Sequence, residues 1–160
     1  MELHKTKIDL GKDTREKIVA ILNQSLADGA DMKSQAKQAH WNVKGPSFIA
    51  LHELFDRVAT ELDTHVDDIA ERITSLGGVA MGTVRLAAEN STLSEYPHEI
   101  FDGTAHVDAL SSALADFGKK VRANIDVTDQ LGDKDTADLY TGISREIDKL
   151  LWFVEAHNQA

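Results

Sequence analysis

One long amphipathic segment constrains the fold of this chain more than any other feature. From residue 48 to residue 76 apolar residues recur every three or four positions, and neither proline nor glycine interrupts them. The members of this stripe are Phe48, Leu51, Phe55, Val58, Leu62, Val66, Ile69, Ile73 and Leu76. This period is typical of an α-helix with one buried face. We therefore predict a helix of about 30 residues, about 45 Å long, which ends at Gly77-Gly78 and packs against other long helices.

Three further segments show the same helical period. They run from about Thr14 to His40, with Asp13 or Thr14 as the N-cap, from about Gly103 to Asp126, and from about Lys134 to His157. Pro46 suits the first turn of the second helix. Residues 77–100 show little periodicity, so we expect a long crossover there, with a short helix near Tyr96 to Phe101. Two helices, a long crossover and two more helices predict an all-α, ferritin-like four-helix bundle.

Composition limits the classes of protein to which this chain can belong. A chain of 160 residues is expected to form one domain, 1–160, with residues 1–12 as a short N-terminal tail. It has no cysteine, which excludes disulfides, thiolate ligands and a cysteine nucleophile. No apolar run approaches the roughly 20 residues of a membrane span, and the N-terminus lacks a signal-peptide core. We therefore expect a cytoplasmic protein with no membrane partner, and its net charge of −10 favours cations over phosphate backbones.

Five side chains of metal-ligating type stand in a helical register. They are His40, His52, Asp56, Asp67 and Glu71. The second and third are four residues apart, as are the last two, so each pair shares one helix face one turn apart. Imidazole with several carboxylates suits a divalent first-row metal such as iron. Hence we predict that these five residues are metal ligands.

The spacing also predicts a partner. Asp56 and Asp67 point nearly the same way, but they are about 16 Å apart along the helix axis. Metal–ligand bonds are about 2 Å long, so the two pairs cannot bind the same ion within one chain. Two copies of the helix packed antiparallel across a two-fold axis would bring Asp56 of one chain to Glu71 of the other. The prediction is therefore a dimer with two shared metal sites.

With these residues assembled, the chain resembles the Dps family, the miniferritins or DNA-binding proteins from starved cells. The resemblance rests on the segments His40-Trp-Asn-Val-Lys-Gly45, Phe48, His52-Glu-Leu-Phe-Asp56, Asp67-Asp-Ile-Ala-Glu71-Arg72 and Ser144-Arg-Glu-Ile-Asp-Lys-Leu-Leu-Trp-Phe153. It implies a shell of twelve subunits that binds ferrous iron at ferroxidase centres across the dimer two-fold. There iron would be oxidised, preferably by hydrogen peroxide, otherwise by O2, and stored inside as ferric oxyhydroxide.

The resemblance also assigns the residues. His40, His52 and Asp56 would come from one subunit, and Asp67 and Glu71 from its partner, while zinc could occupy one metal position. Asp138 and Asp148 would line a three-fold pore for iron entry, whereas Asp133 and Asp135 are explained by the dipole of the last helix. Trp41 and Trp152 are either core anchors or redox-active neighbours of the centre.

Three rival functions remain open at this point. The first is a nucleoid-binding protein that protects DNA, with iron secondary. The N-terminal residues Lys5, Lys7 and Lys12 are offset by Glu2 and Asp9, no basic extension is present, and the net charge is negative, so we expect weak DNA binding or none. The second is a di-metal site inside one bundle, which needs Glu-x-x-His on two helices, and only 95–98 matches. The third, a plain helical interaction protein, leaves the ligand register unexplained.

Overall fold

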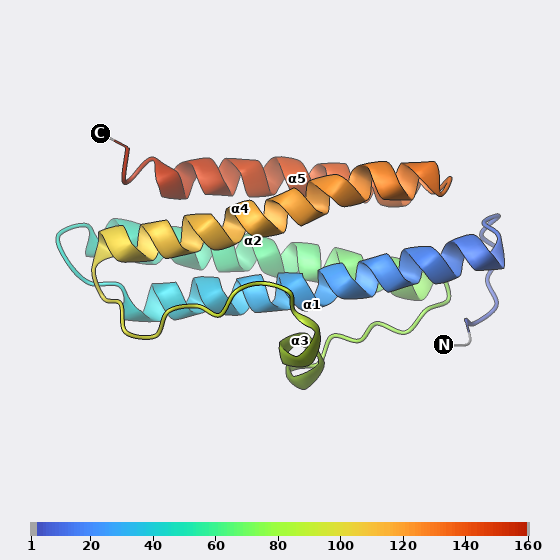
Figure 1. The fold of residues 1–160 in the computed structure, drawn as a ribbon, viewed down its shortest axis with the longest axis horizontal. Helices are drawn as coiled ribbons and strands as arrows, with labels where there is room; N and C mark the ends of the chain where they lie inside the picture. Colours follow the sequence, from blue (N-terminus) through green and yellow to red (C-terminus); the bar gives the residue numbers. More distant parts are fainter. Residues whose placement is uncertain (1–2, 160) are drawn as a thin grey trace.

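The computed structural model describes residues 3–159, so residues 1 and 2 of the expected tail and residue 160 lie outside it. Within that range the chain forms five helices and no strand. The helices, labelled in Figure 1, are α1 (Lys12–Asn42), α2 (Phe48–Ser75), α3 (Val84–Asn90), α4 (Gly103–Gln130) and α5 (Lys134–Glu155). The predicted all-α bundle with a long crossover and a short helix within it is confirmed.

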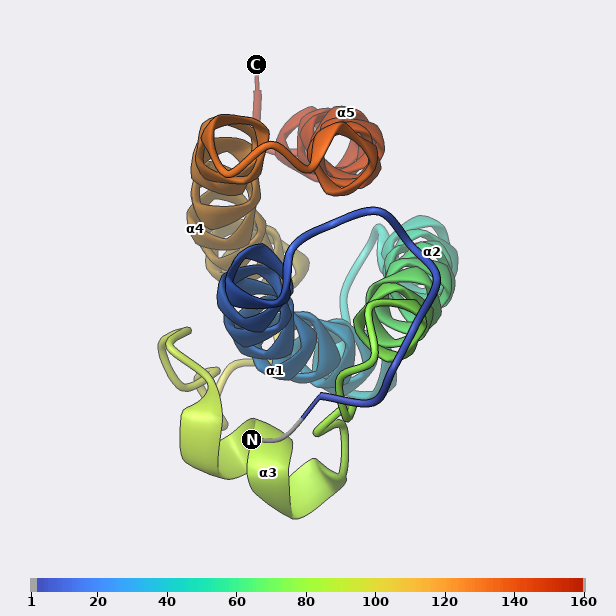
Figure 2. The same ribbon diagram turned by 90° about the vertical axis from the view of Figure 1, so that its right-hand side faces the viewer.

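The four long helices pack as two hairpins. α1 packs along α2 and α4 packs along α5, while α1 also contacts α4 and α2 contacts α5. Viewed end-on in Figure 2, the four long helices surround one core and α3 lies outside it, beside α1. Tyr140, Phe55 and Phe117 are the largest fully buried side chains. Seven residues of the predicted stripe belong to this core, but Val66 is only partly buried and Phe48 is 42% exposed, so the predicted burial of Phe48 was wrong for the single chain.

Some element boundaries differ from the predictions. α1 begins at Lys12 after Gly11, without the side-chain cap expected from Asp13 or Thr14. Pro46 precedes the N-cap Ser47 and lies outside the first turn of α2. The short helix expected near Tyr96 to Phe101 was wrong: α3 lies earlier, where the Thr83 side chain accepts a hydrogen bond from Leu86 N at 3.4 Å. This is the usual N-cap interaction.

The second half of the crossover is not helical, and polar side chains of α1 bind it. The Asp28 carboxylate, 2% exposed, accepts a hydrogen bond from Thr92 N at 2.6 Å. Asp31 accepts one from Ser91 Oγ at 2.5 Å, and Gln35 Nε2 donates to Ser94 O at 3.0 Å. Because these side chains bind two backbone groups and one hydroxyl of the crossover, the segment can stay extended while packed against the bundle.

The N-terminal segment is fastened to the far end of α2. His4 N donates to Gly77 O at 2.8 Å, and Arg15 Nη1 donates to Leu76 O at 2.7 Å. Gly77 has a φ of +86°, a conformation that glycine adopts without strain. Apolar side chains of the same segment, Leu3, Ile8 and Leu10, pack against the core. Residues 3–11 therefore form a strap across this end of the bundle.

A buried histidine predicts acid sensitivity of the fold. His106 is 1% exposed, and its Nδ1 lies 2.8 Å from Tyr96 Oη. Burial lowers the pKa of His106 below 6.5, although the Ile100 carbonyl and Asp102 act in the opposite direction. The unfolded state therefore binds more protons, so the free energy of unfolding falls as the pH falls through the unfolded-state pKa. Urea unfolding between about pH 7.5 and about pH 5 should show this loss, and His106→Gln should reduce it. An unchanged pH dependence in the variant would contradict the assignment.

Candidate metal centre

Two histidines meet where α1 ends and α2 begins. The rings of His40 and His52 stack with centroids 3.8 Å apart. His40 Nδ1 lies 2.7 Å from the carbonyl oxygen of His52, and His52 Nδ1 lies 2.8 Å from that of His40. A carbonyl can only accept, so each Nδ1 carries the hydrogen, which leaves the Nε2 lone pair of each ring free. Reciprocal bonds of this kind fix ring orientation and tautomer as metal-binding histidines require.

Asp56 follows His52 on α2 and already has a cationic partner. Lys37 Nζ of α1 lies 2.6 Å from Asp56 Oδ1. This hydrogen bond is the main reason that the pKa of Asp56 is lowered below 3.8, with smaller contributions from the charge of Lys37 and from His40 and His52. The carboxylate is therefore ionised at neutral pH and able to bind a cation.

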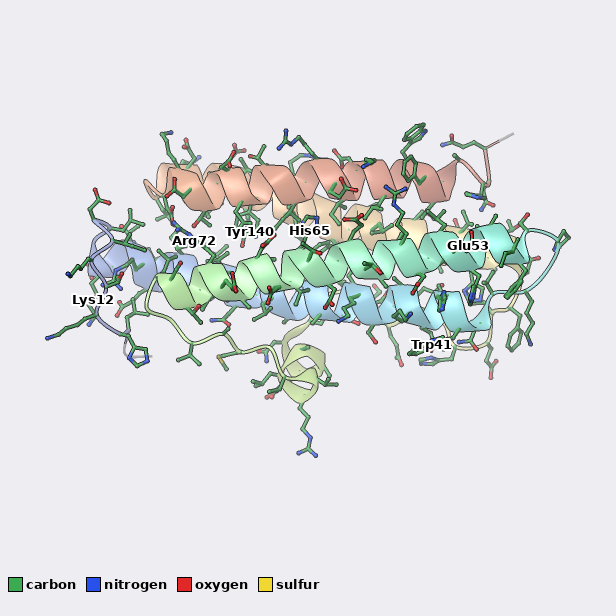
Figure 3. The ribbon with its side chains drawn as sticks, turned by 180° about the vertical axis from the view of Figure 1, so that it is seen from behind. Lys12, Trp41, Glu53, His65, Arg72 and Tyr140 are labelled. Atoms are coloured by element: carbon green, nitrogen blue, oxygen red, sulfur yellow. The ribbon has the colours of Figure 1, made fainter. Side chains whose placement is uncertain are left out.

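Asp67 and Glu71 lie further along α2. This helix is unbroken and carries four of the five predicted ligands, His52, Asp56, Asp67 and Glu71. Asp67 and Glu71 are both exposed in the single chain. Figure 3 shows the two ends of this helix: Glu53, the neighbour of His52, lies near one end of the bundle, and Arg72, the neighbour of Glu71, near the other. The continuity assumed in estimating a separation of about 16 Å is confirmed.

The described part of a single chain contains no complete metal site. Among residues 3–159, no three histidine, aspartate or glutamate side chains come close enough together to bind one ion. The donor types nevertheless suit iron, with free imidazole nitrogens and an ionised carboxylate on one side and two exposed carboxylates on the other. A second chain is therefore needed to complete any site that uses all five residues.

The two tryptophans are not core anchors. Trp41 is 66% exposed and Trp152 is 60% exposed, so that interpretation was wrong for the single chain. The Trp41 ring lies 5.8 Å from Lys37 Nζ, the same atom that binds Asp56. Trp152 instead packs against Phe153, with ring centroids 5.0 Å apart.

The aspartates at and within α5 differ in their surroundings: Asp133 is buried at the start of the helix, and Asp138 and Asp148 are exposed along it. Asp133 is the N-cap of α5 and accepts a hydrogen bond from Thr136 N at 3.0 Å, which confirms its predicted role at the helix start. Asp138 and Asp148, the predicted pore residues, are both exposed. Asp148 forms an ion pair with Arg122 of α4 at 2.5 Å. An iron-entry pore that uses Asp148 would therefore also contain Arg122, unless this ion pair opens.

Lys37 is the residue near the centre that the sequence analysis missed. It lies three residues before His40, so on a helix the two side chains share a face. That spacing could have singled it out, although its contact with Asp56 depends on how two helices face each other.

A bundle with this crossover, and with histidines and carboxylates along one long helix, has the architecture of a ferritin-like protein. The model of the ferritin-like domain matches residues 19–160. The chain is 46% identical to a "DNA protection during starvation protein" of Agrobacterium fabrum, over 99% of this chain and 98% of that protein. A protein of the same name from Brevibacillus brevis is 32% identical over 91% of this chain and 97% of its own length.

Solved structures agree with these sequence comparisons. Mycobacterium smegmatis Dps superposes with a TM-score of 0.94 at 29% identity, over 99% of this chain and 96% of that one. DpsA14 from Streptomyces coelicolor gives 0.94 at 31% identity, over 100% and 96%. The chain therefore belongs to the ferritin-like family, and within it to the Dps proteins. No helix among residues 3–159 has the length and apolarity required to cross a bilayer.

Proposed function

We propose that this protein oxidises ferrous iron at sites shared by two subunits and stores the ferric product inside a shell of twelve. The observation that supports this most directly is the division of the ligands. His40 stacks on His52 near the start of α2 and the ionised Asp56 lies one turn after His52, whereas two exposed carboxylates stand about 16 Å away on the same helix. Half-sites separated in this way become complete when two copies pack antiparallel.

In the proposed site, His40, His52 and Asp56 bind iron together with Asp67 and Glu71 of a second copy. Carboxylates stabilise ferric over ferrous iron and so favour oxidation. Two ferrous ions at one site transfer one electron each to hydrogen peroxide, which takes up two protons and leaves as two waters. Hydroxyl radical is then not released, and iron and peroxide are removed together. O2 is the alternative oxidant, and zinc is a candidate for one of the two positions.

The remaining assignments belong to the same proposal. The whole chain acts as one ferritin-like domain in the cytoplasm. Asp138 and Asp148 line the route of iron into the shell. Trp41 and Trp152 take up stray oxidising equivalents, and Trp41 is the better placed of the two because Lys37 links it to Asp56.

A peroxide titration tests the function. Protein loaded with Fe(II) without oxygen should consume about one peroxide for every two ferrous ions, with no hydroxyl radical detected by a spin trap. Its native mass should be about twelve times 17.6 kDa. The control is Asp56→Asn, which should lose fast oxidation while keeping that mass. Fast oxidation in Asp56→Asn, or a monomeric protein with full activity, would contradict the proposal.

DNA protection is the second candidate, because relatives of this chain bear that name. Direct binding through the N-terminal segment is disfavoured by two observations. Residues 3–11 are fastened to the bundle through His4 and Gly77, and twelve copies would multiply a net charge of −10. We infer that any protection of DNA comes from the removal of iron and peroxide.

A gel-shift experiment checks this inference. Duplex DNA should show no shift with the assembled protein at about physiological salt and neutral pH, because the electrostatic contribution to binding is repulsive. The matched control replaces Lys5 and Lys7 with Gln. A shift with the unmodified protein that these replacements abolish would show that the segment detaches and binds DNA.

A further inference from the structure

A buried tyrosine and a buried histidine are hydrogen-bonded next to the turn of α2 that carries Asp56. Tyr96 Oη, in the second half of the crossover, lies 2.8 Å from Nδ1 of His106 in α4, and the two rings stack with centroids 6.0 Å apart. The side chains are 6% and 1% exposed. Phe55, which directly precedes Asp56, is fully buried, and its ring centroid lies 6.4 Å from that of His106. Burial within one chain persists in an oligomer, so water remains excluded from the pair there as well.

His106 is placed to accept the phenolic proton. Within residues 3–159 its Nε2 is buried without a hydrogen-bond partner, and Tyr96 Oη is bonded to Nδ1 alone. If Nδ1 carried the hydrogen, the phenol hydrogen and the Nε2 lone pair would both be buried without partners, whereas a hydrogen on Nε2 leaves only that N–H unpaired. Each unpaired buried group costs free energy, so the second arrangement is favoured and Tyr96 O–H donates to Nδ1. Burial lowers the pKa of His106, which keeps the ring neutral and able to accept.

Oxidation of a buried tyrosine needs such an acceptor. A phenol that loses one electron also releases its proton, and a base within hydrogen-bond distance must take it where water is excluded. Burial raises the pKa of Tyr96, so no phenolate is present beforehand. The chain has one other tyrosine, Tyr140, which is fully buried, but its Oη lies 2.8 Å from the Ser25 hydroxyl, a poor base. Tyr96 is therefore the tyrosine that can be oxidised with its proton accommodated.

We propose that Tyr96 is an electron donor to the metal centre, with His106 as its proton acceptor, when peroxide meets a site that holds only one ferrous ion. Iron gives the first electron and Tyr96 the second. The phenol O–H bond breaks and its proton moves to His106 Nδ1, while peroxide takes two protons from solvent and leaves as two waters. The products are a ferric ion, a neutral tyrosyl radical and an imidazolium.

The pair is then reset by iron. A later ferrous ion returns one electron to Tyr96 and becomes ferric, and the proton moves back from His106 Nδ1 to the phenol oxygen. A half-filled site thus completes the two-electron reduction of peroxide without releasing hydroxyl radical. This inference rests on the proposed function, which brings iron and peroxide together at Asp56.

The test is electron paramagnetic resonance of the assembled protein. The protein is loaded without oxygen with half the Fe(II) that fills its sites, mixed with peroxide and rapidly frozen. A tyrosyl radical should appear in the unmodified protein and in Tyr140→Phe, the matched control, which loses the other buried phenol. Tyr96→Phe should not form this radical and should release more hydroxyl radical to a spin trap. His106→Gln should form it at least about tenfold more slowly, because an amide cannot take the proton.

A second measurement needs no substitution. In the unmodified protein the radical should show a hyperfine coupling to the proton that His106 has accepted, and this coupling should disappear when the protein is exchanged into D2O. A tyrosyl radical without such a coupling would overturn the role of His106, as would formation at an unchanged rate in His106→Gln.

A tyrosyl radical that remains in Tyr96→Phe, or a radical that resides only on tryptophan, would overturn the role of Tyr96. Failure of the proposed function has a different signature. The unmodified protein would then oxidise Fe(II) no faster than Asp56→Asn does. Fast oxidation without any tyrosyl radical would refute the inference about Tyr96 and leave the proposed function intact.

Discussion

Two inactive variants of this protein should regain iron oxidation when they assemble together. One variant combines His52→Gln with Asp56→Asn, and the other combines Asp67→Asn with Glu71→Gln. Each alone should lose fast Fe(II) oxidation, because every shared site then lacks two ligands. In a two-fold dimer of one copy of each, one site receives all four altered residues and the other receives none. Random co-assembly in equal amounts should therefore restore about a quarter of the sites.

The measurement is the rate at which ferric absorbance appears after peroxide is added to co-expressed subunits. Variants purified apart and mixed without exchange of subunits serve as the control and should stay inactive. A site built within one chain predicts no recovery in either sample. The experiment is insensitive to modest losses of stability, since both samples contain the same altered chains.

The stripe of α2 explains why so much of this site could be predicted. A helical period fixes which residues share a face, so His52, Asp56, Asp67 and Glu71 could be placed relative to one another from their numbers alone. The structure contains α2 from Phe48 to Ser75, close to the predicted extent. The distance between Asp56 and Asp67 along one helix can be calculated without knowing where the other helices lie. That distance is the reason for predicting a second subunit.

Contacts between helices were not predictable in the same way. The Lys37–Asp56 pair joins residues 19 positions apart, and the stacking of His40 on His52 depends on the turn between α1 and α2. In that turn Gly45 has a φ of +110°. Periodicity gives a face but not the rotation of one helix against its neighbour, so the cation on Asp56 could not be inferred.

The position of the short helix within the crossover was predicted wrongly for a related reason. The second half of the crossover takes its conformation from α1, where Asp28 and Asp31 accept hydrogen bonds from residues about 60 positions later. Nothing local to residues 91–102 indicates those partners. The true position of α3 did have a local signal, the N-cap Thr83, which the turn-like glycines nearby obscured.

The second large effect is expected at the buried ion pair between α2 and the start of α5. Arg72 Nη2 lies 2.8 Å from Asp133 Oδ1, with side-chain exposures of 17% and 2%. Arg72→Gln leaves the buried carboxylate with only Thr136 as a partner, so the free energy of unfolding should fall by about 2–4 kcal/mol. Chemical denaturation at one fixed subunit concentration measures it, because assembly also contributes to stability. The control, Lys134→Gln, breaks an exposed pair with Asp129 and should cost less than about 1 kcal/mol.

A double-mutant cycle of Arg72→Gln with Asp133→Asn measures the interaction energy between the two side chains, apart from their interactions with other residues. If the two side chains interact as the geometry indicates, the coupling energy should exceed about 1 kcal/mol, and the double variant should be less damaged than the two losses added together. Additive losses would mean that Arg72 stabilises α2 in some other way. Because Glu71 directly precedes Arg72, weak coupling would also mean that this ion pair does little to hold the end of α2 against α5. The carboxylate proposed to reach into the partner's site would then be positioned by the helix alone.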